Sequence, residues 1–180
     1  MIRFFILLPL LLIGGLLIYA ATRPNQFRIE RSLTMQAPPE RIFPFLNDWL
    51  QFKRWSPWDR LDPHMQSTLS ASTAGVGATY AWSGNKEVGT GRMEITRSTP
   101  NEQVQMQLYF EKPFKAHNTV EITINNSPQG TTVNYAMFGP SPFMSKLMGV
   151  FFNMDKMVGD KFEEGLANLQ GLVEQRVLPQ

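Results

Sequence analysis

Three patterns of hydrophobic and polar residues follow one another along the chain. Residues 4–21 read FFILLPLLLIGGLLIYAA and carry no charge. Residues 27–137 contain segments in which apolar and polar residues alternate, which is typical of half-buried strands. Residues 142–177 place apolar residues at helical spacing. The chain therefore predicts an apolar N-terminal helix, then a sheet, then a long C-terminal helix.

The uncharged opening is long enough for one membrane crossing. About 18 helical residues at about 1.5 Å each span roughly 27 Å, close to the thickness of the hydrocarbon core. A cleaved signal peptide is the alternative, but its apolar core is usually about 7–15 residues long and ends at a small-residue site that Ala20-Ala21-Thr22 matches poorly. We therefore expect residues 1–24 to form an uncleaved transmembrane anchor and joint. Arg3 and Arg23 flank the segment, so the positive-inside rule leaves the topology open.

A strand and a short helix are predicted next. In FRIERSLTM, residues 27–35, the two sides of the predicted strand are Phe27, Ile29, Leu33 and Met35 on one and Arg28, Glu30, Ser32 and Thr34 on the other. Ala37-Pro38-Pro39-Glu40 then ends the strand and starts a helix, because proline and an acidic residue both suit the first helical turn. Pro44 removes a hydrogen bond from this helix, so we expect it to be short or bent.

The segment from Met65 to Met137 predicts an antiparallel meander. Turn residues recur at hairpin distances, as at Ala74-Gly75, Ser83-Gly84-Asn85 and Pro100-Asn101. Alternation places one apolar set on a common inward face, whereas Gln103, Gln105 and Gln107 point outward. The expected inward set is Val104, Met106, Leu108, Phe110, Asn118, Val120, Ile122, Ile124, Val133, Tyr135 and Met137.

A single long helix is expected over residues 142–177, with one broad apolar side that covers the sheet. Lys146, Lys156 and Lys161 are expected on its other faces. Its four glycines each cost about 1 kcal/mol of helix propensity. We therefore expect them to allow close backbone approach or a bend.

Charge and composition narrow the classes of function. The net charge is +2, but 15 Lys and Arg remain against 15 Asp and Glu once Arg3 and Arg23 are set apart, so the rest of the chain is neutral and no nucleic-acid partner is expected. No cysteine is present, which excludes disulfides and thiolate chemistry. His64 and His117 lack metal-ligand spacing, and no catalytic-triad or zinc motif occurs. No metal, cofactor or catalytic residue is predicted.

Several motifs in sequence order carry a family resemblance. The chain from about Phe27 onward resembles the bacterial polyketide cyclase/dehydrase and lipid-transport branch of the SRPBCC superfamily, which is similar to START domains. The resemblance implies an α+β helix-grip domain over residues 25–180, with a curved antiparallel sheet gripping the long helix around an apolar cavity. The motifs are Ala37-Pro38-Pro39-Glu40, Trp55-Ser56-Pro57-Trp58, Asp62-Pro63, Gly75-Val76-Gly77, Tyr80-Ala81-Trp82, Gly84-Asn85, Gly89-Thr90-Gly91-Arg92, Pro113-Phe114, Asn118, Gly139-Pro140, Asp155-Lys156-Met157 and Phe162-Glu163-Glu164-Gly165-Leu166.

The candidate ligand-binding residues are mostly aromatic and apolar. Aromatic residues with a polar handle suit the mouth of an apolar site, and methionines suit an adaptable wall, although both types also form ordinary core. Asn118 would be a buried amide in need of a partner, and Asp155 raises the same question on the helix. The candidates are Trp55, Trp58, Tyr80, Trp82, Met106, Leu108, Phe110, Asn118, Tyr135, Met137, Phe151, Met154 and Asp155.

We expect a binder or carrier of a hydrophobic small molecule or lipid, held as a single-pass protein in the bacterial inner membrane. A cyclase/dehydratase-type enzyme is the first alternative, in which Asn118, Asp155, Tyr135 and Arg92 could offer polar groups to a shaped substrate. A membrane-anchored interaction module with a filled core is the second. An open cavity favours the binder or the enzyme over the module.

Overall fold

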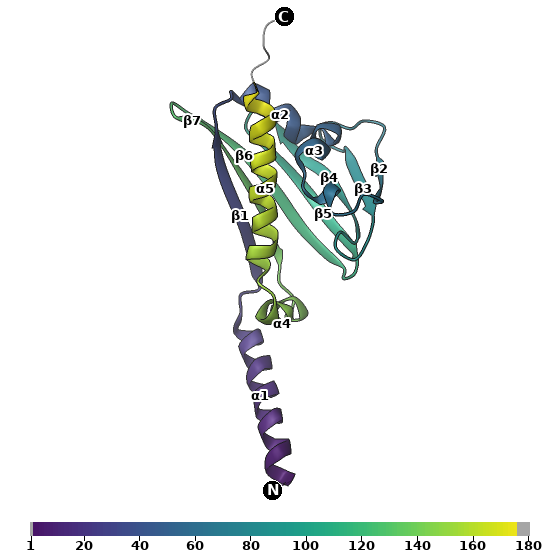
Figure 1. The fold of residues 1–180 in the computed structure, drawn as a ribbon, viewed down its shortest axis with the longest axis vertical. Helices are drawn as coiled ribbons and strands as arrows, with labels where there is room; N and C mark the ends of the chain where they lie inside the picture. The colour runs from purple at the N-terminus through teal and green to yellow at the C-terminus, as the bar shows by residue number, and fades with distance from the viewer. Residues whose placement is uncertain (1, 176–180) are drawn as a thin grey trace, which may run out of the picture.

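The computed structural model describes residues 2–175 of the chain, with side chains from residue 11 onward. Seven strands and five α-helices form one α+β arrangement in which the longest helix of the domain lies across a curved sheet (Figure 1). The elements are α1 (Ile2–Thr22), β1 (Gln26–Met35), α2 (Pro39–Asn47), α3 (Trp49–Trp55), the 3-10 turn η1 (Trp58–Arg60), β2 (Gln66–Leu69), β3 (Thr79–Ser83), β4 (Thr90–Thr99), β5 (Gln103–Lys112), β6 (Ala116–Ser127), β7 (Gly130–Pro140), α4 (Phe143–Phe151) and α5 (Met154–Glu174).

The sheet is antiparallel throughout, with the order β1-β7-β6-β5-β4-β3-β2. Strands β2 to β7 form the predicted meander, and β1 closes the sheet by pairing with β7 from Gln26 opposite Pro140 to Met35 opposite Thr131. On β5, Val104, Met106 and Leu108 are buried while the glutamines between them are half-buried. The predicted register is confirmed, because a shift of one residue would bury the glutamines instead.

A glycine with a left-handed backbone directly precedes strand β4. Gly89 has φ +65°, and a Cβ built there would lie 2.3 Å from the carbonyl oxygen of Lys112. The pairing of β4 with β5 shifts between Thr90 and Gly91, where the strand enters the sheet. A residue with a side chain would be strained at Gly89 both by its dihedral angle and by this contact. An irregularity of this kind bends the strand that carries it.

The first helix before the meander is short, as Pro44 predicts. Pro44 lies inside α2, which ends at Asn47 after nine residues. Asp48 then caps α3, since its Oδ1 accepts a hydrogen bond from the backbone N–H of Leu50 at 2.9 Å. A side-chain oxygen at this position satisfies a backbone donor that the first helical turn leaves without a partner.

The C-terminal segment differs from the single helix that its periodicity predicts. Helix α4 ends at Phe151, Phe152 is extended, and α5 begins at Met154 with the side chain of Asn153 accepting a hydrogen bond from the N–H of Lys156. Helix α4 lies next to α1 at the end of the domain and does not cover the sheet (Figure 1). The expectation of one continuous helix was wrong because a capping asparagine restarts the helix in a new direction.

Helix α5 supplies the apolar layer that covers the sheet. Phe162, Leu166, Leu169 and Val173 are at most 2 % exposed and pack on the inward face of the strands. The ring of Phe162 stacks on Tyr135 of β7 with ring centroids 3.9 Å apart. The expectation of a long helix gripped by a curved antiparallel sheet is thus confirmed for α5.

The N-terminal helix extends away from the sheet (Figure 1). Its described side chains are largely exposed, among them Leu11 at 72 % and Ile18 at 68 %. Within the described residues, no helix combines the length and the apolar character needed to cross a membrane. The transmembrane anchor expected for residues 4–21 is therefore not found there, and residues 4–10 of that expectation lie outside the residues whose side chains are described.

Candidate functional site

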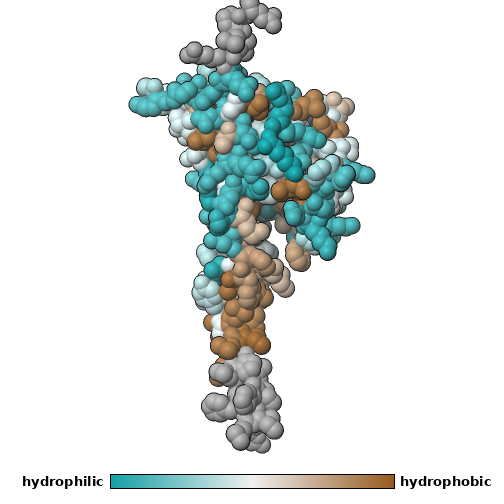
Figure 2. Space-filling view, in the orientation of Figure 1, coloured by the Kyte–Doolittle hydropathy of each residue, from teal (hydrophilic) through white to brown (hydrophobic). Residues whose placement is uncertain are grey.

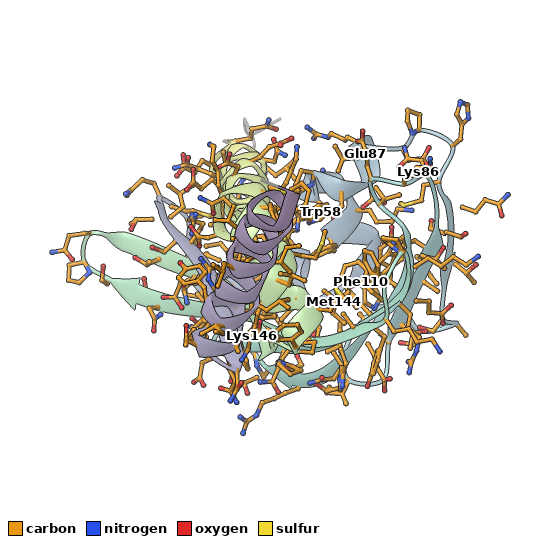
Figure 3. All side chains as sticks on the ribbon, turned by 90° about the horizontal axis from the view of Figure 1, so that it is seen from below. Trp58, Lys86, Glu87, Phe110, Met144 and Lys146 are labelled. Carbon is orange, nitrogen blue, oxygen red and sulfur yellow. The ribbon has the colours of Figure 1, made fainter. Side chains whose placement is uncertain are left out.

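A cavity of about 700 Å³ lies between the inward face of the sheet and α5. Its wall is mostly apolar, with Ile29, Met93 and Val120 from the strands and Val158 from α5. The exposed residues of the lining come mainly from the end of the domain near α1, where β7 ends and β6 and α5 begin. Figure 3 views this end, with α1 in front and Phe110, Met144 and Lys146 labelled. The volume falls within the range of about 300–1,000 Å³ typical of small-molecule sites.

Ten of the candidate residues lie together on this lining. They come from η1, from four strands and from the first turn of α5. The sheet brings the seven strand residues together because alternate residues of neighbouring strands share one face. The ten are Trp58, Tyr80, Trp82, Leu108, Phe110, Asn118, Tyr135, Met137, Met154 and Asp155.

Three candidates lie elsewhere. Trp55 is fully buried, and its Nε1–H donates to the carbonyl oxygen of Phe45 at 2.9 Å, which fixes it in the core beneath α5. Met106 is also fully buried, at a point where the inward face of β5 is covered by packed core instead of the cavity. Phe151 is 65 % exposed because α4 turns away from the sheet. Arg92, proposed for the enzyme alternative, is exposed on the outer face, where it stacks on Tyr109.

A polar group forms one wall of the cavity between η1 and β3. The Tyr80 hydroxyl donates to Oδ1 of Asp59 at 2.9 Å, and Lys53 Nζ lies 3.6 Å from the same oxygen. Burial and the neighbouring Asp59 carboxylate raise the pKa of Tyr80, so this hydroxyl stays protonated. Oδ2 of Asp59 and the Ser56 hydroxyl are buried and have no hydrogen-bond partner among the described atoms. The group combines a proton donor, a carboxylate and a cation.

Two further polar side chains line the cavity from the sheet. Asn118 is 8 % exposed, and none of the hydrogen bonds of the described residues involves its amide. Gly139 makes room for it, because a Cβ there would lie 2.5 Å from Asn118 Oδ1. Tyr135 is buried against Phe162, and burial raises its pKa. A polar amide on an otherwise apolar cavity wall is a candidate contact for a bound molecule.

Asp155 lies at the mouth of the cavity and is already paired. Its carboxylate accepts from Arg31 of β1 at 3.0 Å, and Arg31 also donates to Glu163 of α5 at 2.7 Å. The hydrogen bond from Arg31 lowers the pKa of Asp155, and the two carboxylates raise the pKa of Arg31. Gly159 leaves room for the Arg31 guanidinium against α5. The partner that the sequence left open for Asp155 is therefore a protein side chain.

Sequence reasoning missed Lys146 and Asp59. Lys146 was expected on an outer face of the helix, but it is 8 % exposed and lines the cavity, because α4 and α5 point in different directions. Asp59 directly follows the motif that ends at Trp58, and an acidic residue next to a candidate binding tryptophan was a signal that could have drawn attention to it. In the part of the chain that the structure describes, no group of three His, Asp or Glu residues is arranged to hold a metal ion.

Comparisons with known proteins agree with this geometry. A profile of the family described as "Polyketide cyclase / dehydrase and lipid transport" matches residues 26–174, which cover the sheet and α5. A search of curated proteins finds no match to the chain.

Solved structures share the fold at low sequence identity. Protein MLL2253 from Mesorhizobium loti is 15 % identical, with 84 % of this chain and 100 % of that one covered and a TM-score of 0.62. The di-domain ARO/CYC protein StfQ from the steffimycin biosynthetic pathway is 10 % identical, with 84 % of this chain and 51 % of that one covered and a TM-score of 0.62. DynU16, from the dynemicin biosynthetic locus, is 14 % identical, with 85 % and 48 % covered and a TM-score of 0.57. These similarities establish the fold alone.

Proposed function

Because the chain belongs to the polyketide cyclase/dehydrase and lipid transport family, we propose that its domain binds a hydrophobic small molecule or lipid in the cavity between the sheet and α5. The single observation that carries the proposal is a cavity of about 700 Å³ where a domain of this size normally has packed core. An apolar space of this size favours a binder over an interaction module with a filled interior.

We also propose that this cavity opens close to a membrane. Apolar side chains that α1 and α4 leave exposed support the proposal, including Leu12 at 67 %, Met144 at 60 % and Phe151 at 65 %. In Figure 2 the hydrophobic surface gathers on the lower part of the molecule, beneath the more polar domain. Exposed apolar surface of this extent usually marks an interaction site. Co-sedimentation of the full chain with lipid vesicles would support the proposal, and its absence from the vesicle pellet would contradict it.

The binding function can be tested with the full chain kept soluble in amphipol. Trp58 and Trp82 line the cavity, so energy transfer from tryptophan to a dansyl-labelled fatty acid reports probe bound inside it. We expect saturable transfer that an unlabelled fatty acid displaces, and we expect apolar molecules to co-purify and be identified by mass spectrometry. Absence of both saturable transfer and co-purifying molecules would refute the proposal.

One observation favours a second candidate, a cyclase/dehydratase-type enzyme. Tyr80 and Asp59 form a hydrogen-bonded donor and carboxylate pair on the cavity wall, the kind of pair that can move a proton to or from a bound substrate. Dehydration would leave the ligand of wild-type protein lighter by one water than the ligand of an Asp59→Asn variant. Equal masses of the molecules that co-purify with the two proteins would contradict the enzyme and leave the binder.

A further inference from the structure

The cavity has charged residues at two separate places. Asp59 and Glu87 lie near η1 and the β3–β4 connection, and Asp59 is already bonded to Tyr80 and close to Lys53. Lys146 on α4 and Arg23 directly after α1 lie on the other side, whereas Lys115 lies in the turn between β5 and β6, next to the β3–β4 connection. Figure 3 shows Glu87 and Lys146 on opposite sides of the domain. Lys146 and Arg23 therefore form a cationic side of the mouth, across from the acidic Glu87.

Lys146 is a buried cation without an anionic partner. It is 8 % exposed, and its Nζ donates to Oδ1 of Asn25 at 2.6 Å, which is a neutral amide. Considering the side chains that the structure describes, Nζ takes part in none of the ion pairs. Burial of a charge is costly unless an opposite charge compensates it. A bound anion would supply that compensation.

The charged residues next to Lys146 also favour the binding of an anion. Arg23 donates to the carbonyl oxygen of Gly149 and to the Tyr19 hydroxyl, and neither acceptor carries a charge. The carboxylate of Asp155 at the same end is held by Arg31. Two unneutralised cations thus stand close to the mouth, where an incoming anion meets an attractive potential.

Asn118 provides an independent indication of a ligand farther along the sheet. Its side chain lines the cavity and makes none of the hydrogen bonds of the described residues, and it lies on β6, two strands away from β1, which begins directly after the Asn25 that Lys146 contacts. Two strand spacings correspond to roughly 10 Å. An ester, carbonyl or hydroxyl oxygen in the chain of a ligand could reach this amide while an anionic group lies at Lys146.

Resting on the proposed binding function, we infer that the cavity takes an amphiphile with an anionic headgroup, a carboxylate or a phosphate. Lys146 binds the headgroup at the mouth, and the apolar tail extends along the sheet past Leu108 and Val120 toward Trp82. The bound anion neutralises Lys146, and the tail fills apolar space, so each end of the cavity meets matching chemistry.

The test compares a dansyl-labelled fatty acid with the matched dansyl-labelled fatty alcohol, by energy transfer from Trp58 and Trp82 in the full chain. A buried charge-assisted hydrogen bond predicts that the acid binds about tenfold to a hundredfold tighter than the alcohol. Lys146→Met should abolish this preference and leave the alcohol affinity unchanged. Lys156→Met is the matched control, because Lys156 is exposed on α5 and pairs with Asp160, and it should keep the full preference.

Each outcome bears on a different claim. If neither probe binds, the proposed binding function fails. If both bind equally to wild type, or if folded Lys146→Met keeps the preference, the anionic headgroup site is refuted. If circular dichroism shows that Lys146→Met does not fold, Lys146→Gln is used in its place, because the glutamine amide can still donate a hydrogen bond to Asn25.

Competition experiments distinguish a phosphate headgroup from a carboxylate headgroup. A single-chain lipid phosphate that displaces the acid probe more strongly than a fatty acid identifies a phosphate headgroup, and the reverse order identifies a carboxylate. Millimolar inorganic phosphate should displace little, because the tail supplies most of the binding free energy. Displacement by inorganic phosphate as complete as by the amphiphiles would overturn the inference, since the site would then bind a free anion.

Discussion

Replacement of Leu108 by tryptophan tests whether a ligand tail occupies the cavity. Leu108 is 6 % exposed and lines the cavity, so the larger ring can enter free space without moving the backbone. An indole in place of an isobutyl group adds roughly 60 Å³, about the space of two methylene groups of a tail. At about 0.8 kcal/mol per buried methylene, the loss is about 1.6 kcal/mol, or about fifteenfold in Kd. We expect the free energy of unfolding to change by less than about 1 kcal/mol.

Met106 offers the matched control on the same strand. It faces the same side of β5 two residues earlier but is fully buried in packed core. Met106→Trp should therefore destabilise the protein by about 1–3 kcal/mol through overpacking, and the folded fraction should bind the probe with wild-type affinity.

Both variants are measured by urea unfolding and by titration with the dansyl-labelled fatty acid, with affinity taken from the midpoint and not from the amplitude. The reasoning is refuted if Leu108→Trp binds like wild type while folded. It is also refuted if folded Met106→Trp loses as much affinity as Leu108→Trp, because core and cavity positions would then be equivalent.

Three further predictions concern stability. Leu169→Ala should lower the free energy of unfolding by about 2–5 kcal/mol in urea, whereas Met157→Ala, at an exposed position, should change it by less than about 0.5 kcal/mol; equal losses would contradict the assigned core. Gly89→Ala should lower the free energy of unfolding by more than about 1 kcal/mol, because Gly89 has a positive φ and a Cβ there would meet a strand carbonyl. Gly171→Ala, whose Cβ would meet no neighbour in α5, should raise the free energy of unfolding by about 0.5–1 kcal/mol. Both are measured by thermal melts, and stabilisation by Gly89→Ala would contradict the strained conformation assigned to Gly89. Because the pKa of Tyr80 is raised on folding, the unfolded state ionises first, so the free energy of unfolding is constant below about pH 10 and falls above it. Tyr80→Phe should make this fall shallower in urea unfolding at alkaline pH. An unchanged dependence of the free energy of unfolding on pH would contradict the raised pKa.

The sheet and its inward face follow from the sequence because their pattern is local. Alternation at period two fixes which side of a strand is apolar, and turn residues fix where each strand ends. The burial of Val104 and Ile122 was therefore predictable. The same logic placed the seven strand candidates on one cavity, since residues on a shared face must lie together.

Local pattern could not decide which part of that face is cavity and which is core. Met106 and Leu108 have the same alternation, but only the second borders the cavity, because the difference depends on where helices cover the sheet. Trp55 and Trp58 are likewise separated by the path of the chain between α3 and η1.

The sequence by itself determined the order of elements, the inward face of the sheet and the neutral charge of the domain, because these depend on neighbouring residues and on composition. Only the tertiary structure decided where the C-terminal segment turns at Asn153 and what that turn exposes. Helical periodicity continues across residues 142–174, and it carries no information about a change of direction between two helices. That change buries Lys146 at the mouth of the cavity, a placement that depends on packing between elements far apart in the chain.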